Sequence, residues 1–535
     1  MSRAAEVDFI VVGAGSAGCV LANRLTASGR HNVLLLEAGG EDNDRWIHIP
    51  LGYGKHFRNP KVNWLYTSDP DEKTASRAIG QPRGKVLGGT SSINGMVYVR
   101  GQREDYDEWR DLGNSGWGYA DVLPYFRKAE DNARGADEYH GVGGPLSVSD
   151  PADEHPLCDA FFDAAVARGY PLNGDINGAT QLGFGYNQVT QRGGRRCSTA
   201  VAYLRPARNR PNLIVVTEAH TTRLLLSGKR VAGVEYLREG RRETAHARAE
   251  VILAAGAFNS PQILQLSGLG PAALLQQHGI PVVADMPGVG ANLQDHYNGR
   301  LVFECTDAFT LNDVVRHPLR KLREGLRYFL LRRGFLTMGA STATGFVSTD
   351  PAVSRPDVQI GLVLYSTDKF GDTLHTFSGF TLLVRLLQPE SRGTVQIKSA
   401  DPFDAPAIRP NYLATRKDCD VLVAGMKIAQ DLVNAPPLRR YVAREHEPSR
   451  TFTTDDEWLQ YLRERGGISF HPVGTCRMGQ DDDAVVDERL RVRGIAGLRV
   501  VDASIMPTLV SGNTNAPAIM IGEKGADMIL QDAAA

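Results

Sequence analysis

The chain has 535 residues, of which 42% are hydrophobic and 23% charged, and its 60 basic and 61 acidic side chains leave a formal charge of −1. This balance excludes a general attraction for nucleic acid, so we expect a small-molecule partner and no nucleic acid. At roughly 100 to 200 residues per domain, the length predicts about two or three domains.

Neither a membrane-spanning segment nor a cysteine framework is predicted. No apolar run approaches the roughly 20 residues that cross a bilayer. A strand pattern begins by Val7, which leaves no room for a signal peptide, so we expect a cytoplasmic location. The six cysteines are far apart without a C-x-x-C pair. This spacing favours reduced, mostly buried thiols and neither disulfides nor a metal site.

The first 39 residues predict a βαβ unit that binds a dinucleotide. Residues 7–12 and 33–36 are apolar runs typical of buried strands, and they flank a helical pattern that follows a G-x-G-x-x-G turn. Gly13 allows the turn, Gly15 lets the backbone approach a pyrophosphate, and Gly18 lets helix and strand pack closely. The free N–H groups at the start of the helix would bind the phosphates.

Glu37 follows the second strand and is placed to accept hydrogen bonds from an adenosine ribose. An acid at this position disfavours NADP, but the motif leaves FAD and NAD open, and a glycine-rich turn without chemical use is the structural alternative. The expected contacts of the dinucleotide in this unit are Gly13, Gly15, Ser16, Ala17, Gly18, Glu37 and Ala38.

Residues 81–98 are rich in glycine and small hydroxyl residues. The segment is not a P-loop, because Lys85 is followed by Val86 and too few residues separate Gly80 from Gly84. Its composition suits close passage of the backbone beside a flat ligand. Helices are expected within residues 105–128, and loops over a pocket within residues 141–196, where turn residues dominate.

The second half of the chain adds further predicted elements. Strands are expected at residues 212–217, 231–237 and 250–253, and Ser260-Pro261 has the composition of a helix start. Alternation at residues 394–398 predicts an antiparallel sheet with one wet face. Residues 319–333 carry six basic residues and leucines at helical spacing, which indicates a helix with either a solvated basic face or a membrane-surface or quinone-docking face.

Two segments resemble the signatures of the glucose-methanol-choline (GMC) family of FAD oxidoreductases. The first is residues 84–94, followed by Tyr98, Gly101 and Asp107, and the second is residues 256–270. The likeness is to the choline dehydrogenase and aliphatic alcohol dehydrogenase branch. It implies FAD as the cofactor and a fold with an α/β, Rossmann-like FAD-binding domain plus an α+β substrate domain that contains an antiparallel sheet.

The resemblance also implies boundaries and contacts. We expect the FAD-binding domain at residues 1–155, 201–300 and 471–535, cap and substrate loops at 156–200, and the substrate-binding domain at 301–470. Some members attach FAD through a histidine where this chain has Ile93, so non-covalent FAD is predicted. Thr221 would contact adenine from the turn after the strand at 212–217. Asp502 ends a predicted strand, where acids often meet cofactor hydroxyls. The remaining implied contacts are Thr90, Asn94, Gly95, Val97, Ala503 and Thr514.

Oxidation of an alcohol through a flavin needs a base that removes the hydroxyl proton. Histidine suits this role, because it is mostly neutral at pH 7. His471 precedes a proline, which favours an extended loop, and it occupies the position of the family's catalytic base. Asn515 matches the second active-site position and begins a helix whose N-terminus would face the flavin, although it is also a plausible N-cap. Phe470 and Trp64 are candidates for the wall of the alcohol pocket.

These residues predict the oxidation of a primary alcohol to the aldehyde, with electrons passed to a quinone-like acceptor and a possible weak membrane contact. An oxidase that uses O2, a choline dehydrogenase and a non-redox flavin lyase are the alternatives, followed by a light-driven decarboxylase and a non-catalytic FAD-binding protein. Choline would need an acid or an aromatic box around its ammonium group, which the sequence does not locate. The oligomeric state is open.

Overall fold

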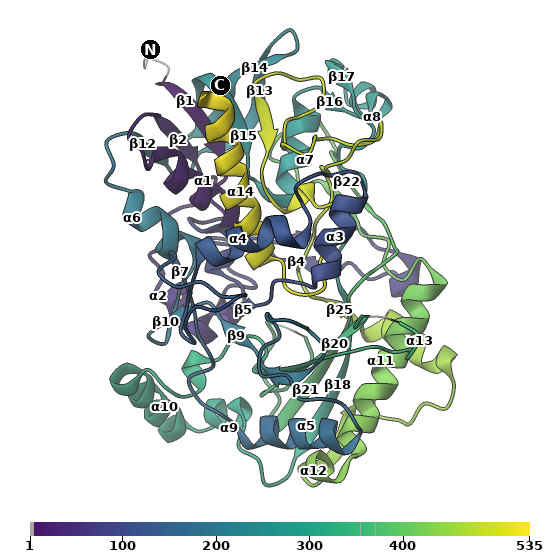
Figure 1. Cartoon of the computed structure of the whole chain (residues 1–535). Coiled ribbons are helices and arrows are strands. Elements are labelled where there is room, and N and C mark those ends of the chain that lie inside the picture. Colours follow the sequence, from purple (N-terminus) through teal and green to yellow (C-terminus); the bar gives the residue numbers. More distant parts are fainter. Residues whose placement is uncertain (1–4, 354, 370, 535) are drawn as a thin grey trace.

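The computed structural model describes residues 5–353, 355–369 and 371–534. Two seven-stranded sheets dominate it, one in the upper and one in the lower part of Figure 1. None of the helices in the described part of the chain combines the length and apolar character that crossing a bilayer requires.

The first sheet has the order β12-β2-β1-β15-β14-β13, with β26 also paired to β15. Its parallel centre is completely buried, and Ile10 of β1 pairs with Leu34 of β2 and Val251 of β15. The predicted βαβ unit is therefore present at the expected residues. The strands are β1 (Ala5–Val12), β2 (Val33–Leu36), β12 (Leu213–Val216), β13 (His220–Ser227), β14 (Arg230–Arg238), β15 (Arg241–Leu253) and β26 (Leu498–Val500).

Two helices from opposite ends of the chain pack against each other beside this sheet (Figure 1). They are α1 (Ser16–Thr26) and α14 (Asn515–Ala534). Their close approach depends on Gly522, because a Cβ atom there would lie 3.1 Å from the Cα atom of Ala17. Arg24 of α1 also forms an ion pair of 2.6 Å with the buried Glu523 of α14.

The second sheet is antiparallel, as predicted for the substrate domain, with the order β24-β18-β21-β20-β19-β8 and β25 paired to β18. The alternating segment near residue 394 forms a separate two-stranded ribbon of β22 and β23. The strands of the large sheet are β8 (Gly183–Tyr186), β18 (Tyr297–Cys305), β19 (Ala343–Val347), β20 (Val358–Val363), β21 (Gly379–Leu386), β24 (Val442–Glu447) and β25 (Gly467–Ile468).

The remaining elements surround these sheets. Helices are predicted correctly within residues 105–128 and 319–333, where α3, α4 and α10 lie. Between α1 and α14 the helices are α2 (Arg45–His48), α3 (Arg103–Asp111), α4 (Tyr119–Ala129), α5 (Pro156–Ala167), α6 (Arg205–Ala207), α7 (Gly256–Leu266), α8 (Ala272–Gln277), α9 (Leu311–Arg316), α10 (Pro318–Leu331), α11 (Arg416–Asn434), α12 (Pro436–Arg439) and α13 (Asp455–Arg465). The short strands are β3 (Tyr66–Thr67), β4 (Gly80–Gln81), β5 (Val97–Tyr98), β6 (Glu130–Asn132), β7 (Leu146–Val148), β9 (Gln188–Val189), β10 (Gln191–Arg192), β11 (Arg195–Arg196), β16 (Leu269–Gly270), β17 (Ala284–Asp285), β22 (Thr394–Gln396) and β23 (Ala407–Arg409).

Four local expectations are wrong, the last of which concerns the start of helix α7. The loops expected over residues 141–196 include the 12-residue helix α5, whose apolar side chains enter the core of the second sheet, and the strand β8. Thr221 lies in strand β13 and not in a turn. Strand β15 begins at Arg241, nine residues before the expected start, because its polar first half pairs with β14 at one end of the sheet.

Helix α7 begins at Gly256, so Ser260 is not its N-cap and Pro261 lies inside the helix. A proline cannot donate to the carbonyl four residues earlier, which is that of Ala257. The hydroxyl of Thr475 donates to this carbonyl at 2.6 Å and satisfies it. Ser260 instead donates to Asp502 at 2.6 Å, which ties the helix to the end of β26.

Candidate active site

One cavity is lined by residues from both sheets, and it brings together nearly every site residue predicted from the sequence. Gly18 is the exception. A Cβ atom at Gly18 would lie 1.9 Å from the carbonyl oxygen of Gly13, so Gly18 allows helix α1 to pack on the turn. The predicted residues that line the cavity are Gly13, Gly15, Ser16, Ala17, Glu37, Ala38, Thr90, Asn94, Gly95, Val97, Thr221, His471, Asp502, Ala503, Thr514 and Asn515.

The wall around the first glycine turn has the donors and space that a dinucleotide needs. Gly13 has a φ of +98°, and Gly15 faces open space, since a Cβ atom there would meet only the carbonyl of Ala254 at 3.9 Å. Glu37 accepts hydrogen bonds from the N–H groups of Ala14 at 2.9 Å and Gly39 at 2.8 Å, one on each carboxylate oxygen. Each oxygen therefore retains a lone pair for a ribose hydroxyl.

Two buried groups at this wall have the chemistry of a binding site for a polar cofactor. Burial raises the pKa of Glu37 to about 7, against the hydrogen bonds from the two N–H groups. The hydroxyl of Thr221 is buried and has no hydrogen-bond partner among the described residues. Since buried polar groups are normally satisfied, these residues fit a polar cofactor.

The segment that resembles the first GMC signature lies against the glycine turn. A Cβ atom at Gly89 would lie 2.6 Å from the Cα atom of Gly15. Asn94 is held by Arg196, whose Nη1 donates to Asn94 Oδ1 at 2.7 Å. Ile93 lines the cavity next to Asn94, where its side chain offers no nucleophile for attachment of a cofactor.

Asp502 has a structural role in addition to lining the cavity. Its Oδ2 atom accepts hydrogen bonds from the N–H of Gly256 at 2.8 Å and the hydroxyl of Ser260 at 2.6 Å. Its Oδ1 atom accepts from the N–H of Ser504 at 2.8 Å. Asp502 therefore holds the start of helix α7 at the end of strand β26.

His471 lies in a loop that is fixed from two sides. The preceding residue, Phe470, has a φ of +64°, which is uncommon for an aromatic side chain. Arg83 donates to the carbonyl of Phe470 at 2.5 Å, and the N–H of His471 donates to Asp295 Oδ1 at 2.7 Å. Strained backbone of this kind is concentrated at functional sites.

A chain of hydrogen bonds sets the tautomer of His471. His296 Nε2 lies 3.1 Å from the carbonyl of Leu387, which can only accept, so Nε2 carries the proton and Nδ1 of this neutral ring carries the lone pair. His471 Nδ1 lies 2.9 Å from His296 Nδ1 and must therefore be the donor. The lone pair of His471 is consequently on Nε2, where Asn513 Nδ2 donates at 3.0 Å.

The surroundings keep both imidazoles neutral. Burial lowers the pKa of His296 to about 3, with a further contribution from the charge of Arg385. Burial, followed by the repulsion that would arise if His296 were protonated as well and by the charges of Arg385 and Arg83, holds the pKa of His471 well below its usual value. His471 therefore stays unprotonated at Nε2 in the neutral pH range, as a general base requires.

Asn513, and not Asn515, contacts His471 in this structure. Asn515 begins helix α14 as expected, and its Oδ1 atom accepts a hydrogen bond from Ser16 Oγ at 2.7 Å. The amide nitrogen of Asn515 makes no hydrogen bond to the described residues. It lines the same cavity, near the N-termini of α1 and α14.

The two aromatic candidates for the alcohol pocket lie in different surroundings. Phe470 packs on Phe57 with ring centroids 5.6 Å apart, next to His471. Trp64 stacks on Tyr66 at 5.5 Å and meets His220, the neighbour of Thr221, at 5.6 Å. Trp64 is thus in the part of the cavity that contains Thr221.

Sequence reasoning missed the groups that hold the base: Arg83, Asp295, His296 and Asn513. His296 is 175 residues from His471, and no local pattern links the two. Asn513 is the one with a usable signal, because it stands two residues before Asn515, in the loop that leads into helix α14.

The chain is similar to known proteins over nearly its whole length. The N-terminal and C-terminal models of the GMC oxidoreductase family match residues 7–298 and 389–522. An alcohol dehydrogenase [acceptor] of Pseudomonas putida is 44% identical over 527 residues, which cover 98% of this chain and 96% of the relative. The mitochondrial choline dehydrogenase of Homo sapiens is 42% identical over 533 residues, which cover 98% and 90%.

Solved structures agree with this relationship. Pyridoxine 4-oxidase from Mesorbium loti has a TM-score of 0.88 at 33% identity, over 97% of this chain and 98% of its own. A variant of formate oxidase from Aspergillus oryzae RIB40 has a TM-score of 0.93 at 29% identity, over 99% of both chains. From its two matching models and these relatives, the chain belongs to the GMC oxidoreductase family.

Proposed function

We propose that this protein oxidises a primary alcohol to the aldehyde with FAD as its cofactor and His471 as the general base. FAD-dependent oxidation of alcohols is supported by the family and by relatives that are named alcohol dehydrogenase and choline dehydrogenase. The observation that carries the proposal is that His471 lines the same cavity as the dinucleotide turn and that its Nε2 atom accepts from Asn513, which lines this cavity too.

The hydroxyl group of the substrate would take the place of the Asn513 amide at His471 Nε2. The base then accepts the hydroxyl proton, while the His471 Nδ1–H bond to His296 keeps the ring in position. The unused amide nitrogen of Asn515 is available to donate to the alkoxide oxygen as its charge develops. FAD, when bound, supplies the acceptor for the hydride that leaves the alcohol carbon.

The cavity wall indicates how the cofactor would be held. The N–H groups at the start of α1, next to Gly15 and Ser16, are suited to the pyrophosphate. Glu37 would bind the ribose hydroxyls, and Thr221 would contact the adenine end. Thr90, Asn94, Gly95, Val97, Ala503 and Thr514 would surround the flavin end, with no covalent bond at Ile93.

The test is anaerobic reduction of the purified holoenzyme by a primary alcohol, followed as bleaching of the flavin band at about 450 nm. We expect bleaching by the wild type and none by His471→Ala, although the variant keeps its FAD. Flavin that no alcohol bleaches would favour a non-redox lyase, and full activity of His471→Ala would remove the base assignment.

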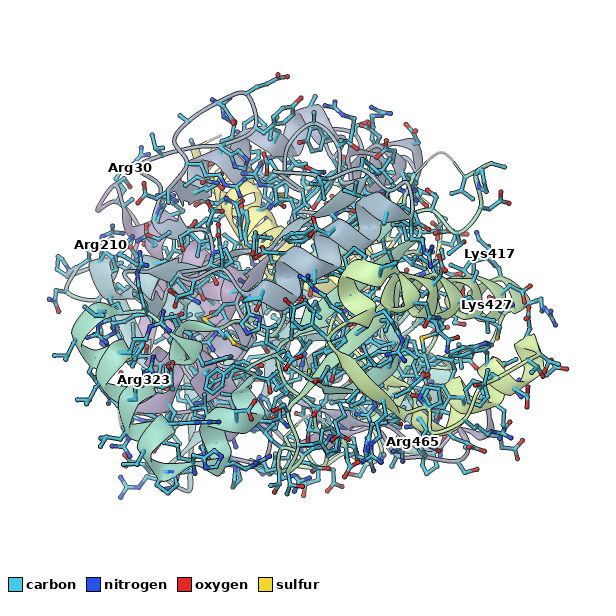
Figure 2. All side chains as sticks on the ribbon, turned by 90° about the horizontal axis from the view of Figure 1, so that it is seen from below. Arg30, Arg210, Arg323, Lys417, Lys427 and Arg465 are labelled. Atoms are coloured by element: carbon cyan, nitrogen blue, oxygen red, sulfur yellow. The ribbon has the colours of Figure 1, made fainter. Side chains whose placement is uncertain are left out.

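We further propose that electrons pass to a quinone in an anionic membrane, on which helix α10 rests. The outward face of α10 is apolar and not simply basic: Leu319 is 80% exposed and Leu330 is 76% exposed, while Glu324 and Tyr328 face the protein. Figure 2 shows Arg323 of α10 at the edge of the molecule, opposite Lys417 and Lys427 of α11.

The composition of α10 favours an anionic membrane as the partner of this helix. The apolar face consists of Leu319, Leu322, Leu326, Phe329 and Leu330, all at least half exposed. Six basic residues lie on or directly after the helix, and one acid faces the protein. An amphipathic helix with this arrangement lies in the surface of a membrane that contains anionic lipid.

Flotation with vesicles that contain phosphatidylglycerol tests the membrane contact. We expect the wild type to float, Leu326→Glu to remain in solution, and Leu112→Glu, an exposed leucine elsewhere, to float. Binding that survives Leu326→Glu would exclude α10. Rapid recovery of the bleached flavin in air, with slow recovery on adding a quinone, would instead identify an oxidase.

A further inference from the structure

Arg385 is a buried cation in the substrate part of the cavity that the function proposed above does not use. It lies on strand β21, where its register partners are Asn298 of β18 and Gln359 of β20. Its side chain is 7% exposed and lines the cavity together with Asn298 and Leu383. Its location between the strands of a rigid sheet fixes where its charge can act.

The guanidinium of Arg385 is poorly satisfied by the protein. Nη1 donates to Gln359 Oε1 at 2.8 Å, whereas Nε is buried without a hydrogen-bond partner. No acid in the described part of the chain forms an ion pair with Arg385. Burying a cation without a counter-charge is costly, and buried charges are normally paired. Arg385 therefore brings a positive charge that no described acid neutralises to the wall of the cavity.

Arg385 differs from the other buried arginines of the described residues because it combines an unpaired charge with a place in the cavity wall. Arg100 forms an ion pair with Glu130, and Arg499 with Glu250 and Asp532. Arg83, which also lines the cavity, has the charge of Asp295 near it. Arg196 also lacks an acid among the described residues and has a buried Nη2 atom without a partner, but it donates to three acceptors and does not line the cavity.

The acids of the cavity are used elsewhere. Its lining contains two, Glu37 and Asp502. Glu37 binds the glycine turn of the first sheet, and Asp502 binds the start of helix α7. Around His471 the wall instead offers Arg83, Arg385, Asn298 and aromatic rings. Because Asp295 lies beside Arg83, the charge left unpaired at this end of the cavity is that of Arg385, which also contributes to the lowered pKa of His471.

We propose that the substrate alcohol carries a carboxylate, which Arg385 binds while the hydroxyl group meets His471 Nε2. The proposal rests on the proposed function and names its substrate class: a hydroxy acid that is oxidised to the corresponding oxo acid. Guanidinium groups pair with carboxylates through two parallel hydrogen bonds, which matches the free donors of Arg385. A quaternary ammonium alcohol such as choline is disfavoured, because the unpaired charge of Arg385 repels it and the two acids that line the cavity, Glu37 and Asp502, are bound to the glycine turn and to helix α7.

The experiment compares ω-hydroxy acids of increasing chain length with their methyl esters in anaerobic flavin bleaching of the holoenzyme. The readout is the ratio of the two half-saturating concentrations. We expect the best acid to bind about tenfold more tightly than its ester, or better, because a charge-assisted pair is lost in the ester. Arg385→Met should bring the ratio close to one, and Arg385→Lys should keep part of the preference.

Arg444→Gln is the matched control, because it removes one positive charge from the same sheet at an exposed ion pair with Glu304, outside the cavity. It should keep the wild-type ratio. Equal binding of acid and ester by the wild type, or a preference that persists in Arg385→Met, would overturn the proposal.

Failure of the proposed function gives a different pattern. If neither the acid nor the ester bleaches the flavin, the proposed oxidation of alcohols is contradicted. Binding is then read from the perturbation of the flavin spectrum by the hydroxy acid. If the hydroxy acid perturbs the wild-type spectrum but not that of Arg385→Met, the carboxylate site at Arg385 is supported although the oxidation is not. If it does not perturb the wild-type spectrum, the carboxylate site is contradicted as well. The wild-type comparison decides the proposal even if Arg385→Met loses FAD.

Discussion

Replacement of His296 by leucine tests whether the rate depends on the tautomer of His471. The substitution removes the acceptor of the His471 Nδ1–H bond, which is 2.9 Å long and fully buried. A buried donor left unsatisfied costs about 1 to 3 kcal/mol, and about 1.4 kcal/mol corresponds to a factor of ten in rate. If the ring turns or changes tautomer to escape this cost, flavin bleaching by a neutral primary alcohol slows by roughly 5- to 160-fold.

His296→Asn is the control, because its Oδ1 atom stands as many bonds from the backbone as the histidine Nδ1 atom and can accept the same hydrogen bond. We expect Asn to recover much of the rate that Leu loses, with FAD retained in both. Nitrogen NMR of His471 should show a protonated Nδ1 in the wild type and in the Asn variant. Equal rates for Leu, Asn and wild type would refute the reasoning, and equal losses would assign His296 to packing alone.

Four further outcomes are expected. The kcat/KM of a neutral alcohol should stay level from pH 8 to below 6.5, since burial holds the pKa of His471 low and only acid below that pKa protonates the base; an acid limb centred at 6.5 or above contradicts this. FAD retention, measured by equilibrium dialysis, should weaken as the pH falls through 7, because Glu37 then loses the negative charge that ribose hydroxyls favour. Glu37→Gln should lower the retention and flatten its pH dependence. Asn515→Ala should slow flavin bleaching about a hundredfold, because it removes a donor to the alkoxide. Asn513→Ala should slow it less than about tenfold, because the substrate displaces this amide. The reverse order of the two effects would exchange the roles of Asn513 and Asn515. Denaturation and filtration should release the yellow colour, because Ile93 offers no point of attachment, and colour kept on the precipitate would show a covalent flavin.

The first βαβ unit could be predicted nearly to the residue because its signals are local. Gly13 needs its positive φ, Gly18 needs the space beside Gly13, and the strands on either side are continuously apolar. The start of helix α14 at Asn515 was predicted equally well, from a polar turn followed by an apolar run. In each case the residues that decide the structure are neighbours in the sequence.

Elements that depend on distant partners were not predictable. The first half of β15 is polar and becomes a strand only by pairing with β14. Helix α7 tolerates Pro261 because Thr475, more than two hundred residues later, satisfies the carbonyl that a proline leaves open. The same reason hides His296: its chemistry arises from a contact with His471 that only the folded chain creates.

The contacts between the first and last helices have a consequence for how the enzyme is made. Ser16 reaches Asn515 and Arg24 reaches Glu523, each across 499 residues. A nascent chain on the ribosome therefore has its glycine turn early but lacks both the base and the closing wall until the last segment has emerged. The glycine turn therefore forms one wall of a cavity that stays open until the segment with His471 and Asn515 has folded against it.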